Sequence, residues 1–183
     1  MNGQKEYAKS QRQAAAIAVI RNHLSGTIVM GVYPLLQNET CHFLAVDFDK
    51  EAWKEDAKAF AETCKLEGIT AALERSRSGN GAHVWIFFDS PVPAAKARKL
   101  GTFLMTRTLD RRPEIGLDSF DRFFPNQDTM PKGGFGNLIA LPLQKEARAK
   151  NSASILSLIN RVISTQLQRN SLLFINSYIF YSP

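Results

Sequence analysis

The stretch CHFLAVDFD, residues 41–49, decides how the rest of the chain is interpreted. Its apolar run is typical of a buried β-strand, and the run ends on two aspartates, Asp47 and Asp49. Alternate residues of a strand face the same way, so both carboxylates are predicted on one face and Phe48 on the other. The stretch therefore predicts a strand that presents two acids side by side at its end.

Helical and extended patterns alternate after this strand. The predicted elements are a helix at 51–67, strands at 69–75 and 82–88, a helix at 94–109 and a strand near 117–121. With strand 41–49 in front, the order is βαββαβ, in which helices back one antiparallel sheet. The sequence thus predicts an α+β fold with an RRM-like palm.

An N-terminal α/β extension is predicted before this palm. Residues 9–24 are rich in alanine with apolar residues at helical spacing, and Ser25-Gly26 ends the segment. Residues 27–36 are predicted to form a strand, separated from strand 41–49 by turn-forming residues. A further apolar segment, NLIALPL, lies at 137–143.

The composition is that of a globular protein with a basic excess. Hydrophobic residues make up 44% and charged residues 22%, and the net charge of +6 suits a polyanionic partner such as a nucleic acid. Cys41 and Cys64 lack metal-ligand spacing and are expected to be buried, reduced thiols. We find no signal segment and no apolar run that could span a bilayer, so we expect a cytoplasmic protein without a membrane partner.

The paired aspartates suggest a metal site. Two carboxylates this close repel each other unless a cation lies between them, and hard ions such as Mg²⁺ or Mn²⁺ prefer oxygen ligands. Two such ions about 3.5–4 Å apart can activate a hydroxyl and stabilise a departing pyrophosphate. A pair of aspartates is also common where a strand meets solvent, so the motif needs support from other segments.

That support comes first from the loop SRSGNGAH, residues 76–83. Its glycines let backbone N–H groups approach phosphate oxygens, and its arginine, serines and histidine add donors. The candidate nucleotide-binding residues are Arg77, Ser78, Gly79, Asn80, Gly81 and His83. An ordinary hairpin turn is the alternative, although a turn does not require this set of side chains.

A third carboxylate is expected from the segment around FDRFFPNQD, residues 120–128. The candidates are Asp118, Asp121 and Asp128. Asp121 is favoured because its aromatic neighbours can anchor a strand, whereas Asp118 follows the flexible Gly116.

Together these motifs resemble the archaeo-eukaryotic primase superfamily, and most closely the primase domain of TOTE conflict systems. The segments that carry the likeness are HLSG (23–26), GVYPLL (31–36), LAVDFD (44–49), ERSRSGNGAHVWIFF (74–88), FDRFFPNQD (120–128) and GGFGNLIALPLQ (133–144). That superfamily has a DxD strand, a small-x-His strand and a later acid. Asp47 and Asp49 match the first motif, His83 the second, and Asp121 the third.

The resemblance implies a primase-polymerase, a nucleotidyltransferase that acts in a mobile element or conflict system beside helicase and nuclease modules. Its catalytic set would be Asp47, Asp49, Asp121 and His83, and the three aspartates would hold two Mg²⁺ or Mn²⁺ ions. Nucleoside triphosphates and a DNA template with its primer are the expected partners. Two alternatives stay open: a non-catalytic RRM-like nucleic-acid-binding module, and a metal-dependent nuclease that uses the same carboxylates.

The last 33 residues differ in composition from the rest. Residues 151–183 contain no Asp, Glu or Gly, whereas residues 1–150 hold all 17 acids and all 11 glycines. A natural interaction helix is one interpretation, and a reading frame that shifted near Asn151 is the other. The abrupt loss of acids favours the second, so we predict a catalytic domain at 1–150, itself incomplete if the chain is truncated, and an atypical tail at 151–183.

Overall fold

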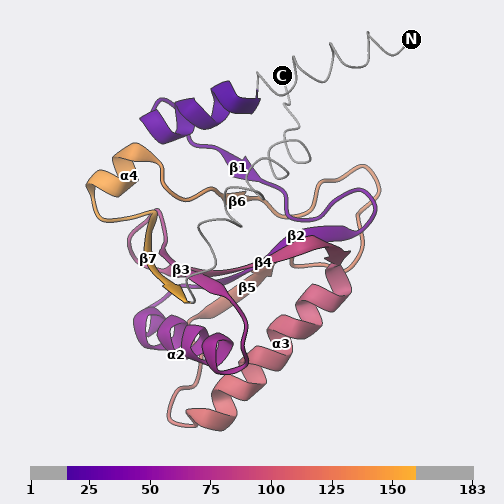
Figure 1. Ribbon diagram of the computed structural model, residues 1–183, viewed down its shortest axis with the longest axis vertical. Coiled ribbons are helices and arrows are strands. Elements are labelled where there is room, and N and C mark those ends of the chain that lie inside the picture. The colour runs from indigo at the N-terminus through magenta and orange to yellow at the C-terminus, as the bar shows by residue number, and fades with distance from the viewer. Residues whose placement is uncertain (1–15, 160–183) are drawn as a thin grey trace.

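The computed structural model describes residues 16–159, with side chains as far as residue 153. A five-stranded antiparallel sheet forms its centre, in the order β5-β2-β4-β3-β7 (Figure 1). The strands are β2 (Thr40–Phe48), β3 (Ala71–Arg75), β4 (Ala82–Pro93), β5 (Phe120–Phe124) and β7 (Ser154–Ile159). Antiparallel sheets combined with helices agree with the predicted α+β class.

Two helices cover one face of this sheet, α2 (Trp53–Leu66) and α3 (Ala94–Arg111) (Figure 1). Acids in the first turn of α2 and Lys65 in its last turn suit the helix dipole. Apolar residues from both helices and from the sheet form the larger core, which includes Leu44, Val46, Phe48, Phe60, Val84 and Leu104. Cys41 and Cys64 also lie there as free thiols, as expected, and burial raises the pKa of each to about 12.

The other face is partly covered by a second, smaller sheet of β1 (Gly31–Val32) and β6 (Ile139–Ala140) (Figure 1). Between the two sheets lies a second core that contains Val32, Phe43, Ala45, Ala72, Trp85, Phe124 and Ile139. The large sheet is therefore buried on both faces in this region. The remaining part of the second face is the part that carries the polar residues described below.

His23 connects the N-terminal helix to this small sheet. The helix occupies residues 16–25 of the described chain, and His23 is only 2% exposed. Its Nε2 donates to the carbonyl oxygen of Pro142 at 2.9 Å, and its Nδ1 accepts from the N–H of Met30 at 3.1 Å. A buried histidine with both nitrogens paired explains the HLSG segment as a structural element.

The extension differs from its prediction in extent. The strand predicted at 27–36 is reduced to β1, and the segment at 137–143 contributes only β6, because the two pair over two residues. The strand predicted near 117–121 begins at Phe120, where pairing with β2 starts. Residues 9–15 of the helix predicted at 9–24 lie outside the described residues. A short helix, α4 (Lys145–Ala149), follows β6, and none of the described helices is long and apolar enough to cross a membrane.

The sheet continues beyond residue 150. β7 has six residues and pairs with β3, and Arg75 donates from Nη1 to the carbonyl oxygen of Asn151 at 3.3 Å. Residues 160–183 lie outside the described residues. The boundary at residue 150 therefore stays a prediction, and β7 provides a way to test it.

We expect a chain that ends at residue 159 to be more stable than one that ends at residue 150. The shorter chain loses β7 and the Asn151 acceptor of Arg75 Nη1, and it exposes the edge of β3. A difference of about 1–3 kcal/mol in the free energy of unfolding is expected from a few lost hydrogen bonds. Urea denaturation of both chains measures it, and equal midpoints would place the end of the domain at residue 150.

Candidate active site

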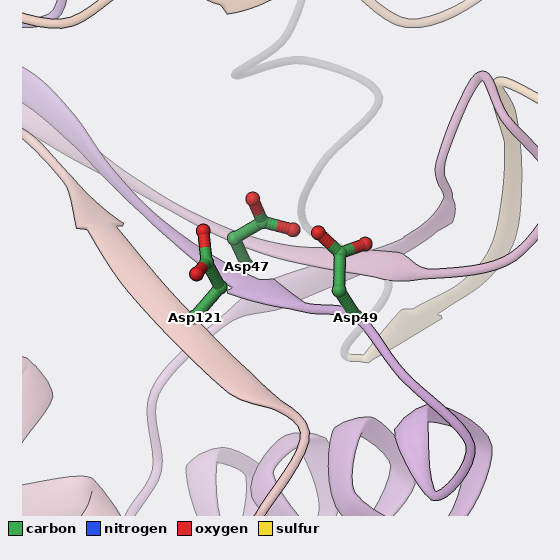
Figure 2. A group of neighbouring side chains, drawn as sticks. All are labelled: Asp47, Asp49 and Asp121. Carbon is green, nitrogen blue, oxygen red and sulfur yellow. The ribbon is translucent and has the colours of Figure 1, made fainter.

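Three carboxylates meet where β2 and β5 lie side by side (Figure 2). Asp47 lies in β2, Asp49 directly follows that strand, and Asp121 is the second residue of β5. An oxygen of each carboxylate lies within 4.8 Å of an oxygen of the other two. Phe48 is fully buried on the opposite face, so the alternation of the strand places both β2 acids together.

A β-bulge brings the third carboxylate to the same face. The pairing of β5 with β2 skips Asp121: Arg122 lies opposite Asp47, while Phe120 lies opposite the next residue of β2. Phe120 and Phe123 both pack against the core beneath the sheet. The extra residue of the bulge therefore leaves Asp121 and Arg122 together on the face that carries Asp47. There Arg122 Nε donates to Asp121 Oδ2.

The other two candidates for the third carboxylate lie elsewhere. Asp128 forms an ion pair with Arg98 of α3. The main-chain oxygen of Asp118 accepts from Lys50 Nζ at 3.2 Å, and Asp118 is exposed. Within the described residues, the acids that approach one another closely enough to share a cation are those of Figure 2.

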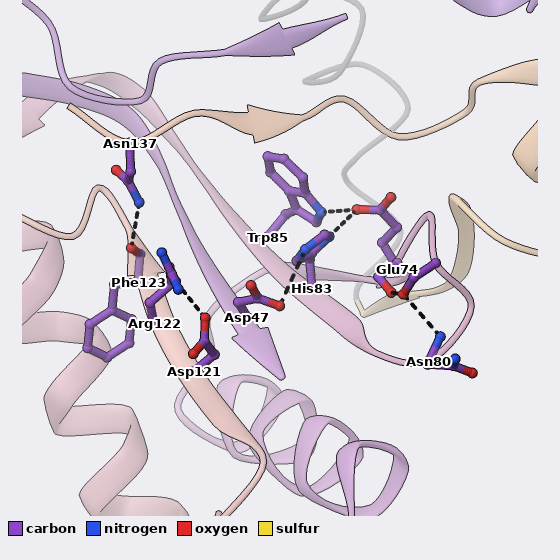
Figure 3. Close-up of polar contacts among 11 residues, drawn as sticks. Asp47, Glu74, Asn80, His83, Trp85, Asp121, Arg122, Phe123 and Asn137 are labelled. Carbon is purple, nitrogen blue, oxygen red and sulfur yellow. Dashed lines mark hydrogen bonds and ion pairs between the residues drawn. The ribbon is translucent and has the colours of Figure 1, made fainter. Parts of the chain in front are cut away.

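A row of polar side chains crosses the sheet through this cluster (Figure 3). His83 of β4 lies opposite Asp47 on one side and opposite Glu74 of β3 on the other. His83 Nε2 is 3.5 Å from Asp47 Oδ1, and His83 Nδ1 is 3.0 Å from Glu74 Oε2. Trp85 Nε1 donates to the same Glu74 oxygen at 2.7 Å. The histidine is therefore held between two carboxylates.

The charges of this row shift the pKa values of its members. Burial raises the pKa of Asp47 to about 6, and the neighbouring charges of Asp49 and Asp121 add to the rise while His83 opposes it. Burial would lower the pKa of His83, but its hydrogen bond with Glu74 and the surrounding negative charges raise it above the ordinary value. A raised pKa of Asp47 means that its contribution to stability is present at acidic pH and is lost as pH rises through about 6.

Gly81 allows the loop to approach Asp49. A Cβ added at Gly81 would lie 2.7 Å from the carbonyl oxygen of Phe48 and closer still to Asp49 Oδ1. Gly81 is not among the glycines with positive φ, so its backbone conformation does not require glycine. The requirement comes instead from the space that the Asp49 carboxylate occupies.

The rest of the loop is held by its own hydrogen bonds. The N–H of Gly79 donates to the carbonyl oxygen of Ser76, and the N–H of Asn80 donates to Ser78 Oγ. Two of the N–H groups expected to bind phosphate are thus already used. The guanidinium of Arg75 donates twice to the carbonyl oxygen of Gly79, so this arginine holds the loop in shape.

The structure divides the predicted nucleotide-binding residues into two groups. Gly81 and His83 adjoin the carboxylates. Arg77 and Ser78 line a pocket of about 240 Å³, together with Val29, Gln144, Glu146, Ala147 and Lys150. The pocket lies against α4 and Val29, and its lining does not include Asp47, Asp49 or Asp121.

Sequence reasoning missed two residues of the site, Glu74 and Arg122. Glu74 is 2% exposed and lies in a strand whose neighbours are mostly buried, so an acid within an apolar strand was the available signal. Arg122 follows Asp121 directly, but simple alternation would place these two side chains on opposite faces. Only the bulge places both on the same face.

Comparison with known proteins assigns the chain to a family. No curated protein matches the chain. Residues 2–172 match the family model described as the archaeo-eukaryotic primase domain of the TOTE conflict system. The match covers nearly the whole chain, includes every element that contributes to the site, and extends into the predicted tail. The chain therefore belongs to the archaeo-eukaryotic primase domain family of TOTE conflict systems.

Proposed function

We propose that this chain is a primase-polymerase that adds nucleotides to a DNA or RNA strand under the direction of a template. The observation that carries the proposal is the group of three carboxylates from β2 and β5, with His83 beside it. Family membership supports a nucleotidyltransferase of the primase type. The larger sheet would then serve as an RRM-like palm, with the carboxylates on its accessible part.

The donor set fits divalent ions of the hard class. Asp47, Asp49 and Asp121 offer only oxygen atoms, and these lie close enough together to hold a cation. Asp47 is 9% exposed, so its charge is costly unless a cation balances it. Two Mg²⁺ or Mn²⁺ ions would activate the attacking 3′-hydroxyl and stabilise the departing pyrophosphate.

The residues of the chain then supply position and charge. Nε2 of His83 faces the carboxylates, and the charged form of the ring, which its raised pKa favours, can donate from Nε2 to a phosphate oxygen of the incoming nucleotide. Gly81 leaves room for the Asp49 carboxylate at the edge of the site, and the exposed Arg122 adds a positive charge on the same face. The strand's hydroxyl attacks the α-phosphate directly, so no covalent enzyme intermediate is required and positioning accounts for the catalysis.

A non-catalytic RRM-like binding module is less compatible with the sheet. Such modules stack bases on exposed aromatic residues of the sheet face. Here Phe43 is fully buried and Trp85 is 2% exposed, because the small sheet covers them. The uncovered part of the face carries carboxylates, which repel phosphates in the absence of cations.

Primer extension distinguishes the proposal from both alternatives. The full chain is incubated with Mn²⁺ or Mg²⁺, nucleoside triphosphates and an end-labelled primer on a DNA template. Longer products support the polymerase, shorter products indicate the nuclease, and a mobility shift with an unchanged primer indicates the binding module. Parallel reactions with deoxynucleotides, ribonucleotides and no primer define the substrate. Association with helicase and nuclease modules belongs to the proposal through family likeness, and a cytoplasmic location through the sequence pattern.

The choice of third carboxylate gives a separate prediction. Asp121→Asn should slow nucleotide addition about tenfold to a hundredfold, because it removes one oxygen ligand from the cluster. Asp118→Asn and Asp128→Asn should retain activity within about threefold, since surface changes of this kind rarely matter. Rates at saturating Mn²⁺ measure all three. The largest loss at Asp128 would transfer the third ligand to the turn after β5.

A further inference from the structure

Glu74 is a buried carboxylate that the proposed chemistry does not use. It is 2% exposed, and one of its oxygens, Oε2, is the partner of both His83 Nδ1 and Trp85 Nε1. Burying an acid is unfavourable unless it is well paired, so a neutral apolar residue would serve a purely structural strand better. The contacts of Glu74 therefore need an explanation beyond packing.

The register of the sheet provides that explanation. Glu74, His83, Asp47 and Arg122 lie opposite one another on four successive strands, so acids and bases alternate across the sheet. Glu74 occupies the buried end of this row, and Arg122 occupies the exposed end. The two inner residues, His83 and Asp47, each have a partner on both adjacent strands. The buried end therefore sets the orientation of His83 relative to the metal cluster.

Trp85 makes the buried end rigid. Its ring is nearly parallel to that of Phe87, with an interplanar angle of 6°, and it also contacts the ring of Phe43. The indole N–H donates to Glu74, so the carboxylate is held by a side chain that is itself packed in the second core. A carboxylate held in this way can accept from His83 in only one ring orientation.

We propose that Glu74 is a positioning residue that acts through His83. Both neighbours of the ring are carboxylates, but Glu74 Oε2 lies 3.0 Å from Nδ1 whereas Asp47 Oδ1 lies 3.5 Å from Nε2. The closer contact is the hydrogen bond, so the neutral ring keeps its proton on Nδ1, and Nε2 faces Asp47 and the bound nucleotide. This inference rests on the proposed function only for its effect on activity. The fixed tautomer is a property of the folded chain and can be measured without any catalysis.

The first test is the tautomer itself. Nitrogen NMR of the full chain, labelled at histidine and measured at alkaline pH, distinguishes a protonated from an unprotonated ring nitrogen. His83→Ala identifies the signals of His83 among the three histidines. The proposal expects a proton on Nδ1 and none on Nε2, and the opposite pattern would overturn it. In Glu74→Gln, whose amide can also donate to Nδ1, the single tautomer should be lost.

The second test is a double-mutant cycle on nucleotide addition. Glu74→Gln should lower kcat/KM about 10- to 100-fold, the usual cost of losing a partner that orients a functional histidine. In a His83→Ala background the same substitution should cost less than about twofold, because Glu74 acts only through His83. Equal costs in both backgrounds would show that Glu74 merely stabilises the fold and would overturn the proposal.

A matched control is Asp56→Asn. Asp56 is also 2% exposed, and its Oδ2 accepts from the N–H and the hydroxyl of Ser119, away from His83. This control should leave the His83 tautomer unchanged. It should lower kcat/KM by the same factor in the parent and in the His83→Ala background. If the parent chain adds no nucleotide, the proposed function fails, and the NMR measurement still decides the role of Glu74.

Discussion

Asp47→Asn is expected to reduce nucleotide addition by at least about a hundredfold to a thousandfold, the scale seen when one preorganised electrostatic group is removed. Asp47 lies at the centre of the site, since it belongs to the carboxylate cluster and also contacts His83. The amide keeps the shape of the side chain but removes the charge that would bind a cation. Single-nucleotide incorporation at saturating Mn²⁺ measures the loss.

Asp47→Asn should also gain less thermal stability from Mn²⁺ than the parent chain does. Mn²⁺ should raise the melting temperature of the parent chain, because an ion that binds only the folded state stabilises it. Asp47→Asn should show a much smaller rise, whereas the control Asp118→Asn should behave like the parent, since Asp118 lies outside the cluster. Full activity of Asp47→Asn would refute the assignment of the metal site.

Gly81→Ala is expected to cost about a hundredfold in activity, although it adds a single methyl group. That methyl would lie 2.7 Å from the carbonyl oxygen of Phe48, where ordinary contacts begin near 3.4 Å, and it would overlap the carboxylate of Asp49. Both groups must move, and a shift of roughly 1 Å at a reacting site can reduce the rate by about 10²-fold. Metal affinity should fall as well, because Asp49 is displaced from its neighbours.

Gly68→Ala is the control for this substitution. Gly68 has a φ of +72°, and beyond its chain neighbours nothing lies within 4 Å of the position its Cβ would take, so alanine introduces backbone strain of about 1–2 kcal/mol without a steric clash. It should lower the melting temperature and leave Mn²⁺ affinity and kcat unchanged. Comparable losses of activity in both variants would show that Gly81 affects stability rather than the position of Asp49.

Much of the fold follows from local patterns. The helical spacing of residues 51–67 predicted α2, and the helical pattern of residues 94–109 predicted α3, which begins at Ala94. The extension was predicted less well, because β1 and β6 depend on each other over only two residues. An edge pairing that short leaves little signal in either segment, and apolar residues on both sides suggested longer strands than those that form.

The site, like the fold, has one part that local sequence predicts and another that depends on strand pairing. The alternation of β2 was enough to place Asp47 and Asp49 together, since side-chain direction along a strand is a local property. The position of Asp121 depends on a bulge, and the bulge forms because Phe120 and Phe123 both pack against the core. Aromatic neighbours correctly suggested an anchored strand there, but the direction of the side chain depends on the pairing with β2.

The residue types and their short spacing therefore determined which functional groups the site can contain. These are two acids on one strand, a histidine near the start of another, and glycines in the loop before that histidine. Their distances depend on contacts between residues far apart in sequence, because strand register is set by pairing across the sheet and by burial of its two faces. Register places Glu74 next to His83 and Arg122 next to Asp47. It also brings Gly81 against Asp49, a contact that no local pattern specifies.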